Sequence, residues 1–235
     1  MKKIAVLTGA GVSAESGLST FRGSGGLWGK YDPEEVASIE GWRRNPSLVL
    51  SFYNGFRERL SETEPNAAHR AIASLESEYE VSVITQNVDN LHERAGSTSV
   101  LHLHGEATKV RPDRGVYDRT FSESEVLDIG YGAVHLGDLA PNGSQLRPHI
   151  VFFGEAVPNI EKAAEIVSGA DIMLIVGTSL NVYPAAGLYR YAPASTPVYL
   201  IDPEDVAVSD PRIVHIREVA TTGMTTFCRL IKEVD

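Results

Sequence analysis

The sequence contains a single cysteine, Cys228, among its 235 residues. A disulfide within the chain and a four-cysteine zinc site are therefore both excluded. Basic residues are also few, because 21 Lys and Arg stand against 31 Asp and Glu, a net charge of −10. This charge repels nucleic-acid phosphates and anionic membrane surfaces, so neither is an expected partner. No apolar run exceeds about six residues, whereas a membrane-spanning helix needs about 20.

The first residues, Met1 to Leu7, resemble the start of a signal peptide, but Gly9 and Gly11 interrupt the apolar stretch too early. The composition of 43% hydrophobic and 22% charged residues is typical of a globular protein. We therefore expect a soluble, cytoplasmic protein. Its length fits one large domain, or a large domain that carries a small one.

Short apolar runs alternate along the chain with longer segments of helical period, a pattern that indicates an α/β fold. The runs are almost continuously hydrophobic, as in strands buried on both faces of a parallel sheet. They lie at residues 4–7, 81–85, 150–153, 172–176, 198–201 and 213–216, and helices are expected at 46–61, 67–77, 158–168 and 222–234. The sequence thus predicts a Rossmann-like parallel sheet with helices on both faces.

Two regions interrupt this alternation. Residues 28–64 are mostly helical and rich in aromatic side chains, and residues 105–148 are rich in glycine, proline and charge. We expect these insertions to associate as a small lobe. The Rossmann-like lobe then comprises residues 1–27, 65–104 and 149–235, and a cleft between two lobes is a usual place for a ligand.

The first expected strand leads into a turn with the Gly-x-Gly-x-x-Ala spacing of dinucleotide-binding folds. Gly9 permits the tight turn, Gly11 lets the backbone approach a pyrophosphate, and Ala14 allows close helix packing. A dehydrogenase would have an acidic ribose-binding residue about 20 residues later. Gly25 to Trp28 stand there instead, so simple hydride transfer is disfavoured.

Polar side chains follow the second expected strand, at the ligand-facing edge of such a sheet. Asp89 can accept a hydrogen bond from a carboxamide, and Gln86 and Asn87 can hold ribose hydroxyls or a water. Helix capping by Asn87 or Asp89 is the alternative. Further on, His102 and His104 alternate along a strand and face one side. They lack a third metal ligand nearby, so a general-base role for His104 is favoured over a metal pair.

These motifs, taken in order, resemble those of the sirtuins, the NAD-dependent protein lysine deacylases. The matching segments are GAGVSAESG (9–17), TFRG (20–23), TQNVDNLH (85–92), HG (104–105), RPHIVFFGE (147–155), GTSLNVYP (177–184) and IDPE (201–204). The opening segment and residues 25–28 most resemble the bacterial, class III branch. The resemblance implies that NAD and an acyl-lysine protein or peptide meet in a cleft between a Rossmann-like lobe and a small lobe.

The resemblance also implies roles for individual residues. Those implied to bind NAD are Gly9, Ala10, Gly11, Ser13, Ala14, Glu15, Phe21, Arg22, Trp28, Gln86, Asn87, Val88, Asp89, Gly177, Thr178, Ser179, Asp202, Pro203, Glu204 and Met224. Those implied to contact the acyl-lysine substrate are Tyr53, Phe56, Val151, Phe153, Gly154 and Glu155. His104 and Asn87 are the implied catalytic residues, with His104 as base. The implied products are free lysine, nicotinamide and O-acyl-ADP-ribose.

The sequence departs from the sirtuin pattern where the family binds zinc. Four cysteines are usual between residues 105 and 147, but this segment has none, and His135 and His149 are too few to replace them. We therefore expect NAD as a cofactor and no zinc. Local packing must then order the segment, because its backbone entropy has to be overcome.

Two further departures concern specificity. The class III branch often carries Tyr-x-x-Arg to bind a succinyl carboxylate, but Tyr53 is followed by Phe56 here. Arg57 lies one position later, which on a helix is a rotation of about 100°. An apolar acyl group, acetyl or longer, is expected, unless Tyr53 and Phe56 serve only the core. Asp202 replaces the usual asparagine and disfavours a 2′-phosphate, so NAD is expected rather than NADP.

Two other functions could use the same residues. ADP-ribosyl transfer or NAD hydrolysis would bring another nucleophile to the same ribose carbon, and a non-enzymatic NAD sensor would keep only the pocket. The intact segment 151–155 favours a peptide substrate, and the presence of His104 and Asn87 favours an enzyme. The sequence specifies neither the physiological substrates nor the oligomeric state.

Overall fold

The computed structural model describes residues 1–18, 31–114, 122–208 and 210–234. Its main layer is a six-stranded sheet in the order β3-β2-β1-β7-β8-β9. All neighbouring strands in it are parallel. The strands are β1 (Lys3–Thr8), β2 (Glu80–Thr85), β3 (Val100–His102), β7 (Ile172–Val176), β8 (Val198–Ile201) and β9 (Ile213–Ile216). The strands expected at 4–7, 81–85, 172–176, 198–201 and 213–216 are confirmed.

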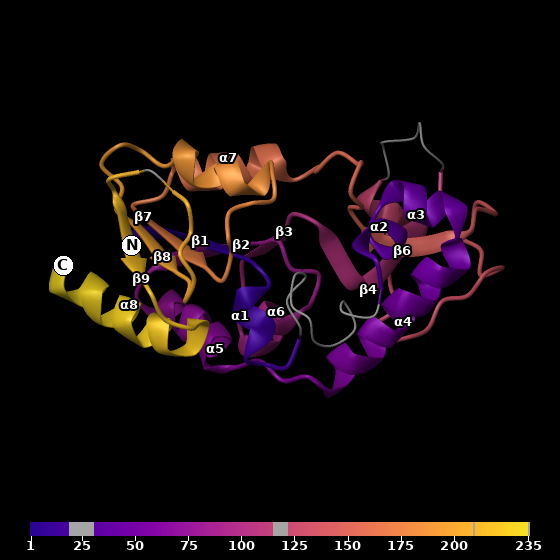
Figure 1. Cartoon of the computed structure of the whole chain (residues 1–235), viewed down its shortest axis with the longest axis horizontal. Coiled ribbons are helices and arrows are strands. Elements are labelled where there is room, and N and C mark those ends of the chain that lie inside the picture. The colour runs from indigo at the N-terminus through magenta and orange to yellow at the C-terminus, as the bar shows by residue number, and fades with distance from the viewer. Residues whose placement is uncertain (19–30, 115–121, 209, 235) are drawn as a thin grey trace.

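Helices cover both faces of this sheet (Figure 1). The helices are α7 (Ile160–Ser168) and the 3₁₀ helix η4 (Ala185–Tyr191) on one face, and α5 (Ala67–Ser74) and α8 (Ala220–Val234) on the other. Ile4 and Val6 of β1 pack with α5 and α8, whereas Ala5 and Leu7 pack with α7 and η4. Because both faces are buried, residues 4–7 of the strand are all apolar. The predicted Rossmann-like α/β class is confirmed.

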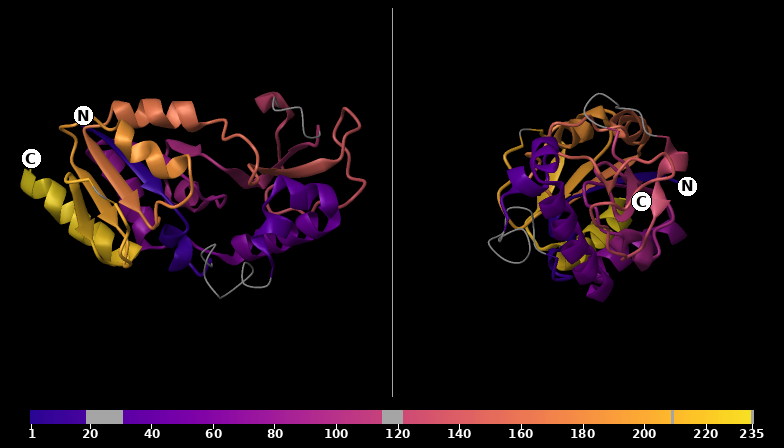
Figure 2. Two further views of the ribbon diagram at one scale, coloured as in Figure 1. Left: turned by 45° about the horizontal axis from the view of Figure 1, so that its top comes forward. Right: turned by 90° about the vertical axis from the view of Figure 1, so that its right-hand side faces the viewer.

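The rest of the molecule is built on a small antiparallel sheet, in the order β5-β4-β6. Its strands are β4 (Gly105–Pro112), β5 (Leu127–Asp128) and β6 (Leu146–Ile150), and the accompanying helices are α2 (Pro33–Val36), α3 (Ile39–Arg44) and α4 (Pro46–Glu62). These elements share a core that includes Trp42, Phe52, Val110 and Phe152. Figure 2 shows them at the end of the molecule away from both termini. The two expected insertions thus pack together, while the exact lobe boundaries stay a prediction.

Short helical segments complete the described chain: α1 (Gly11–Ala14), η2 (Leu75–Ser77), α6 (Leu91–Ala95) and η3 (Glu123–Glu125). Side-chain caps begin several of the longer helices. Asn45 accepts a hydrogen bond from the Leu48 N–H at the start of α4, and Asn66 accepts from Ala68 and His69 at the start of α5. Within the described ranges, no helix is both long and apolar enough to cross a membrane.

Residues 150–153 differ from the sequence prediction of a buried parallel strand. Ile150 ends the antiparallel strand β6, and the chain then leaves the sheet. The Val151 N–H donates to the carbonyl of His104, and the Phe153 N–H donates to a carbonyl between α2 and α3. Successive amides therefore meet different segments, so no regular ladder continues here.

Within this run, Phe152 is buried against helices, whereas Phe153 is 49% exposed. The Phe152 ring lies with its centroid 6.4 Å from that of Trp42 and 6.1 Å from that of Tyr53. Phe152 is 1% exposed. A short apolar run indicates burial, but it does not distinguish a sheet strand from a buried loop.

Candidate functional site

A cavity of about 620 Å³ lies between the small sheet and the carboxyl ends of the parallel strands. Open α/β sheets bind ligands at this edge. The cavity brings together most of the predicted cofactor residues, namely Gly9, Ala10, Gly11, Ser13, Ala14, Glu15, Gln86, Asn87, Val88, Asp89, Gly177, Thr178, Ser179, Asp202, Pro203 and Glu204. His104 and the predicted substrate residues Tyr53, Phe56, Val151, Phe153, Gly154 and Glu155 line it as well.

Four of the predicted cofactor residues are not among these. Phe21, Arg22 and Trp28 lie outside the described residues. Met224 is described, but it is fully buried in the core between α8 and the sheet and does not line the cavity. Its place in that core follows from the apolar stripe that α8 turns toward β8, so the prediction for Met224 is corrected.

The cavity also has lining residues that sequence reasoning missed. They are Leu18, Ala37, Ile150, Phe152, Val157, Val182, Tyr183, Pro184, Ile201, Val219 and Ala220. Val182, Tyr183 and Pro184 belong to the segment 177–184 that carries the resemblance, so the motif itself held their signal. Ala37 and Val219 come from segments without any motif, and only the fold places them here.

The turn after β1 packs backbone to backbone against the turn after β7. The Gly11 N–H donates to the Gly177 carbonyl at 2.9 Å. A Cβ on Gly11 would lie 2.6 Å from the Gly177 Cα, and one on Gly177, where φ is +62°, would lie 2.3 Å from the Val12 nitrogen. Only glycine fits at both positions. The approach keeps side chains out of this part of the cavity, as a bound pyrophosphate requires.

Glu15, a predicted cofactor residue, has a structural partner. Its two carboxylate oxygens accept hydrogen bonds from the Thr221 N–H at 3.0 Å and the Thr221 hydroxyl at 2.7 Å. The carboxylate therefore ties α1 to the start of α8, at the rim of the cavity.

Ser13, Asn87 and Asp89 form a buried polar cluster at the inner end of the cavity. The Asn87 amide donates to the Ser13 hydroxyl at 3.1 Å, and that hydroxyl donates to Asp89 at 3.0 Å. The other Asp89 oxygen accepts from the N–H of Leu91, the first residue of α6, at 3.1 Å, although the N-cap residue of α6 is Asn90. Burial raises the pKa of Asp89, and the hydrogen bonds from Leu91 and Ser13 oppose that rise. Asp89 therefore bonds to the start of a helix and lines the cavity at the same time.

His104 lies just beyond β3 with one ring nitrogen fixed by the backbone. Its Nδ1 lies 3.0 Å from the carbonyl oxygen of Gln86. A carbonyl only accepts, so Nδ1 carries the proton and Nε2 keeps a lone pair. Burial lowers the pKa of His104, against the opposing effect of the hydrogen bond to Gln86. The ring is thus a neutral base at neutral pH, beside Asn87 in the cavity wall.

Carboxylates occupy the end of the cavity at β8. Asp202 accepts the Glu204 N–H at 3.0 Å through one side-chain oxygen, and its carbonyl accepts from His215 at 3.0 Å. The second Asp202 oxygen is available to hydroxyl donors such as those of a ribose. Nearby, the Gln86 amide donates to the Thr178 hydroxyl at 3.1 Å. The glycine turn, which carries no side chains, lies between this end and the Asn87–Asp89 cluster. The cavity can therefore hold a pyrophosphate in the middle and a ribose at each end, as in a dinucleotide.

The small-sheet side of the cavity is apolar. Tyr53 and Phe56 of α4 line it, and burial raises the pKa of the Tyr53 phenol, which keeps its proton. Arg57 does not line it. Its guanidinium donates to the carbonyls of Gly132 at 2.8 Å and Ala107 at 3.0 Å and to the Asn54 side chain. Burial lowers the pKa of Arg57 to about 10, so it stays a cation at neutral pH.

Glu155 contributes to the cavity wall, yet its carboxylate is held within the protein. It accepts from Arg147 at 2.8 and 3.0 Å, from Arg111 at 3.4 Å and from the Phe152 N–H at 2.8 Å. The Arg147 guanidinium also lies 4.3 Å from the centre of the Phe152 ring. The side chain thus fixes the turn 152–155, whose backbone borders the cavity.

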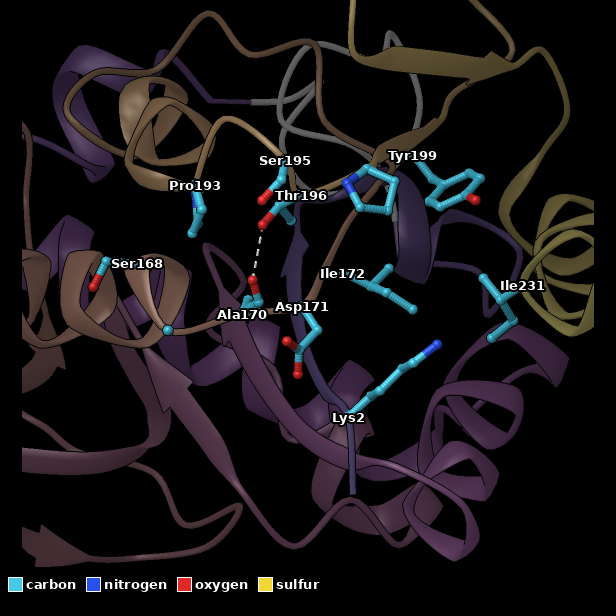
Figure 3. A pocket seen from close by; sticks show the side chains of 12 residues that line it. Lys2, Ser168, Ala170, Asp171, Ile172, Pro193, Ser195, Thr196, Tyr199 and Ile231 are labelled. Atoms are coloured by element: carbon cyan, nitrogen blue, oxygen red, sulfur yellow. Dashed lines mark hydrogen bonds between the residues drawn. The ribbon is translucent and has the colours of Figure 1, made fainter. Parts of the chain in front are cut away.

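A second cavity, of about 430 Å³, lies at the opposite, amino-terminal ends of β1, β7 and β8 (Figure 3). Lys2, Asp171, Thr196 and Tyr199 are among the residues that line it. No predicted site residue does so. Only the first cavity therefore combines the motifs found in the sequence.

Comparison with known proteins identifies relatives over the whole chain. The Sir2 family model matches residues 9–184. An NAD-dependent protein deacylase of Bacteroides thetaiotaomicron is 53% identical over 232 residues, 98% of each chain. A solved Sir2 homologue in complex with NAD is 36% identical, with a TM-score of 0.84, and the match covers 99% of this chain and 90% of that one.

A Sir2 variant solved with a deacetylated p53 peptide and 3′-O-acetyl ADP-ribose is also similar. It is 28% identical, with a TM-score of 0.77, over 98% of this chain and 92% of that one. The chain belongs to the Sir2 family, and the resemblance to sirtuins read from the motifs is confirmed.

Proposed function

We propose that this chain is an NAD-dependent protein lysine deacylase. One observation carries the proposal: a single cavity joins the glycine turn, the Asn87–Asp89 cluster, His104 and the apolar wall of Tyr53 and Phe56. A dinucleotide and an acylated lysine could therefore meet at one base. The deacylase name of the Bacteroides relative and the peptide complex of the Sir2 variant support the same activity.

NAD, when bound, supplies the ADP-ribose that receives the acyl group as nicotinamide is released. The chain's own residues position the dinucleotide and remove a proton from one of its ribose hydroxyls. Gly9, Gly11 and Gly177 leave room for the pyrophosphate, and Asp202 accepts from the hydroxyls of the ribose next to the adenine. Asn87 holds the other ribose near His104, whose unprotonated Nε2 takes a proton from a hydroxyl there. Residues of the cavity wall orient the reactants and exclude water, which lowers the barrier of the reaction.

The apolar wall favours a neutral acyl group, acetyl or longer. None of the described residues that line the cavity is a lysine or an arginine. Arg57 donates its hydrogen bonds to Gly132, Ala107 and Asn54 instead. A succinyl carboxylate would be buried there without a cation, at a cost of several kcal/mol. The class III character of the motifs therefore does not extend to this specificity.

We also propose that the protein folds without zinc. In the part of the chain that the structure describes, no three His, Cys, Asp or Glu residues gather as metal ligands. Hydrogen bonds from α4 order the segment in which the family binds zinc. The Asn54 side chain exchanges two bonds of 2.9 Å with the backbone of Val134, and Arg57 holds Gly132. Elemental analysis that finds about one zinc per chain would contradict this proposal.

The test is incubation with NAD and one lysine peptide that carries acetyl, succinyl or a long acyl chain, followed by mass spectrometry. The expected result is acyl-dependent release of nicotinamide with formation of O-acyl-ADP-ribose, slowest with succinyl. The matched variant Phe56→Arg restores the Tyr-x-x-Arg spacing and should raise the succinyl rate relative to the acetyl rate. Nicotinamide release at the same rate with and without the acylated peptide would indicate NAD hydrolysis or ADP-ribosyl transfer instead. A cytoplasmic location stays a prediction from the sequence.

A further inference from the structure

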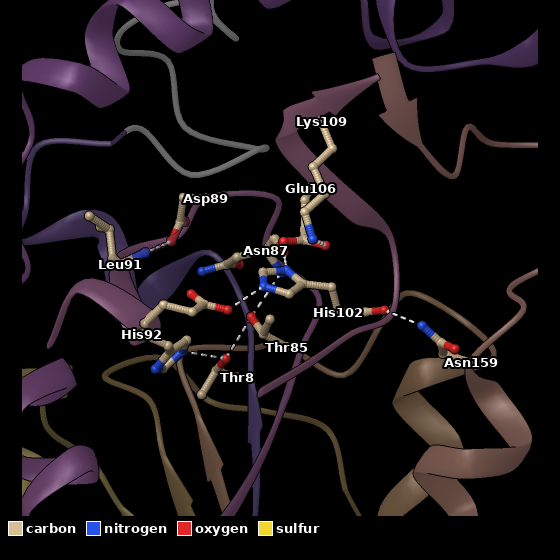
Figure 4. Close-up of polar contacts among 11 residues, drawn as sticks. Thr8, Thr85, Asn87, Asp89, Leu91, His92, His102, Glu106, Lys109 and Asn159 are labelled. Atoms are coloured by element: carbon tan, nitrogen blue, oxygen red, sulfur yellow. Dashed lines mark hydrogen bonds and ion pairs between the residues drawn. The ribbon is translucent and has the colours of Figure 1, made fainter. Parts of the chain in front are cut away.

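His102 lies next to Asn87, one of the proposed catalytic residues (Figure 4), and its ring also contacts the carboxylate of Glu93. Its Nδ1 is 3.0 Å from the carbonyl oxygen of Asn87, and its Nε2 is 2.8 Å from an oxygen of Glu93 on α6. The side chain of His102 is 7% exposed, and that of Glu93 is 39% exposed. His102 does not line the cavity. Its hydrogen bond to the site goes to the backbone of Asn87.

The geometry defines the protonation of this ring. A carbonyl oxygen only accepts hydrogen bonds, and an ionised carboxylate does the same. Both ring nitrogens of His102 therefore face acceptors, so both bonds form only when both nitrogens carry protons. His104, two residues on, has one nitrogen on a carbonyl and the other unpaired within the described residues. His102 and His104 thus bond to the carbonyls of the neighbouring residues Asn87 and Gln86. The His102 ring does so as a cation and the His104 ring as a neutral group.

The surroundings of His102 favour its charged form. Burial alone would lower the pKa of His102, but the hydrogen bond and charge of Glu93, with Glu106, raise it overall. The pKa of Glu93 is lowered overall, because the hydrogen bond and charge of His102 exceed the opposing effect of burial. The other ionisable groups whose charges interact with the ring are Asp89 and His92 on the α6 side and His149 on β6, whereas Lys109 acts on Glu93. Lys109 is itself paired with Glu106 at 2.7 Å.

Asn87 has three fixed points, and His102 provides the one on its carbonyl. The Asn87 N–H donates to the Thr85 hydroxyl at 3.0 Å, and its side-chain amide donates to Ser13 at 3.1 Å. With all three in place, the peptide plane and side chain of Asn87 have one orientation toward the cavity. Loss of the carbonyl contact would free the peptide plane to rotate.

We propose that His102 and Glu93 form a positioning pair that holds Asn87 in its reactive orientation and makes the reaction rate fall when His102 loses its charge as the pH rises. The inference rests on the proposed deacylase function. A neutral His102 has one N–H for two acceptors, and the carboxylate is the stronger of the two. The remaining N–H therefore stays on Nε2, where it donates to Glu93. Nδ1 then has no proton, and the carbonyl of Asn87 loses its hydrogen bond. Misplacement of a reacting group by about 1 Å can cost about a hundredfold in rate.

The discriminating variant is Glu93→Gln. A glutamine amide can donate to an unprotonated Nε2, so a neutral His102 keeps its N–H on Asn87 and both contacts survive. We expect deacylation at pH 7.5 within about threefold of the wild type, and the decline of kcat with rising pH to disappear. A merely structural role would lower the rate without changing the shape of this profile.

Two further variants complete the set. His102→Gln replaces the bifunctional ring and should lower kcat about tenfold to a hundredfold, with a smaller change in the KM for NAD. His135→Gln is the matched control, because His135 is an exposed histidine that lies 3.7 Å from Asp138 and does not line the cavity. It should leave both rate and profile unchanged. An unaltered decline with rising pH in Glu93→Gln, or no decline in the wild type, would overturn the inference.

Nitrogen-15 NMR of the histidine rings separates this inference from the proposed function. The doubly protonated signal of His102 should persist to a higher pH in the wild type than in Glu93→Gln, because the carboxylate raises the pKa of the ring. A His102 titration that Glu93→Gln leaves unchanged refutes the pair, whatever the activity. If no acyl peptide is turned over while the NMR result stands, the proposed function fails and the ion pair holds.

Discussion

Glu155→Gln tests how the turn beside the cavity is held. Arg111 of β4 and Arg147 of β6 lie directly opposite each other in the strand register, and both are at least nine-tenths buried. Like charges in that position destabilise a sheet. The Glu155 carboxylate bonds to both guanidinium groups and to the Phe152 N–H. Its single negative charge therefore offsets part of the repulsion between the two cations and fixes the turn at the same time.

Removal of the charge takes away the carboxylate that bonds to both guanidinium groups, while the charge of Asp113 still acts on Arg111. Breaking a buried ion pair by changing one partner costs about 3–5 kcal/mol. The Glu155 side chain is 21% exposed, so we take the lower end, about 3 kcal/mol of unfolding free energy. Urea denaturation of the wild type and the variant measures this difference. The KM for the acyl peptide should rise in parallel, because the turn 152–155 forms its side of the cavity.

The double variant Arg147→Met with Glu155→Gln supplies the control. It removes one of the two cations along with the carboxylate, so it should lose less stability than the sum of the two single variants. A loss below about 1 kcal/mol in Glu155→Gln, or additive losses in the double variant, would refute the reasoning.

Two further predictions concern stability. Burial lowers the pKa of His69 to about 4 and that of His149 to about 3. The unfolded chain, with histidine pKa values near 6.5, then binds more protons below that pH, and linkage gives a loss of about 2 kcal/mol per histidine at pH 5. Denaturant titrations at pH 8 and pH 5 check this, and equal midpoints would contradict it. Gly177→Ala should cost more than about 3 kcal/mol, because its Cβ would meet the Val12 nitrogen at 2.3 Å in addition to the strain of a positive φ. Gly143→Ala, with φ +82° and open space around it, should cost only about 1–2 kcal/mol, and equal losses in the two variants would rule out the clash.

Much of the parallel sheet could be predicted from the sequence, because its strands are buried on both faces. Residues 4–7 and 172–176 are all apolar and buried, a pattern that predicts strands buried on both faces of a sheet. The run 150–153 has the same composition, but there the burial comes from Trp42 and Tyr53 on helices that lie about 100 residues earlier in the chain. The sequence alone does not predict that Trp42 and Tyr53 pack against this run.

The candidate site was predictable where a residue belongs to a motif at a strand end, as Gly9, Asn87 and His104 do. Met224 was misplaced because position on a helix does not tell whether a side chain faces the sheet or the ligand. The partners of Arg57 and His102 could not be predicted either. Gly132, Ala107 and Glu93 become their neighbours only through the packing of α4, β4 and α6.

The most direct test of the account is the rate of deacylation in His104→Ala. We predict that the wild type converts an acetyl-lysine peptide and NAD into equal amounts of deacylated peptide, nicotinamide and O-acetyl-ADP-ribose. His104→Ala should fold, bind NAD and lose at least about a hundredfold in that rate, because general-base catalysis contributes about 10²–10⁴-fold. A variant that deacylates at the wild-type rate would contradict the assignment of His104 as the base.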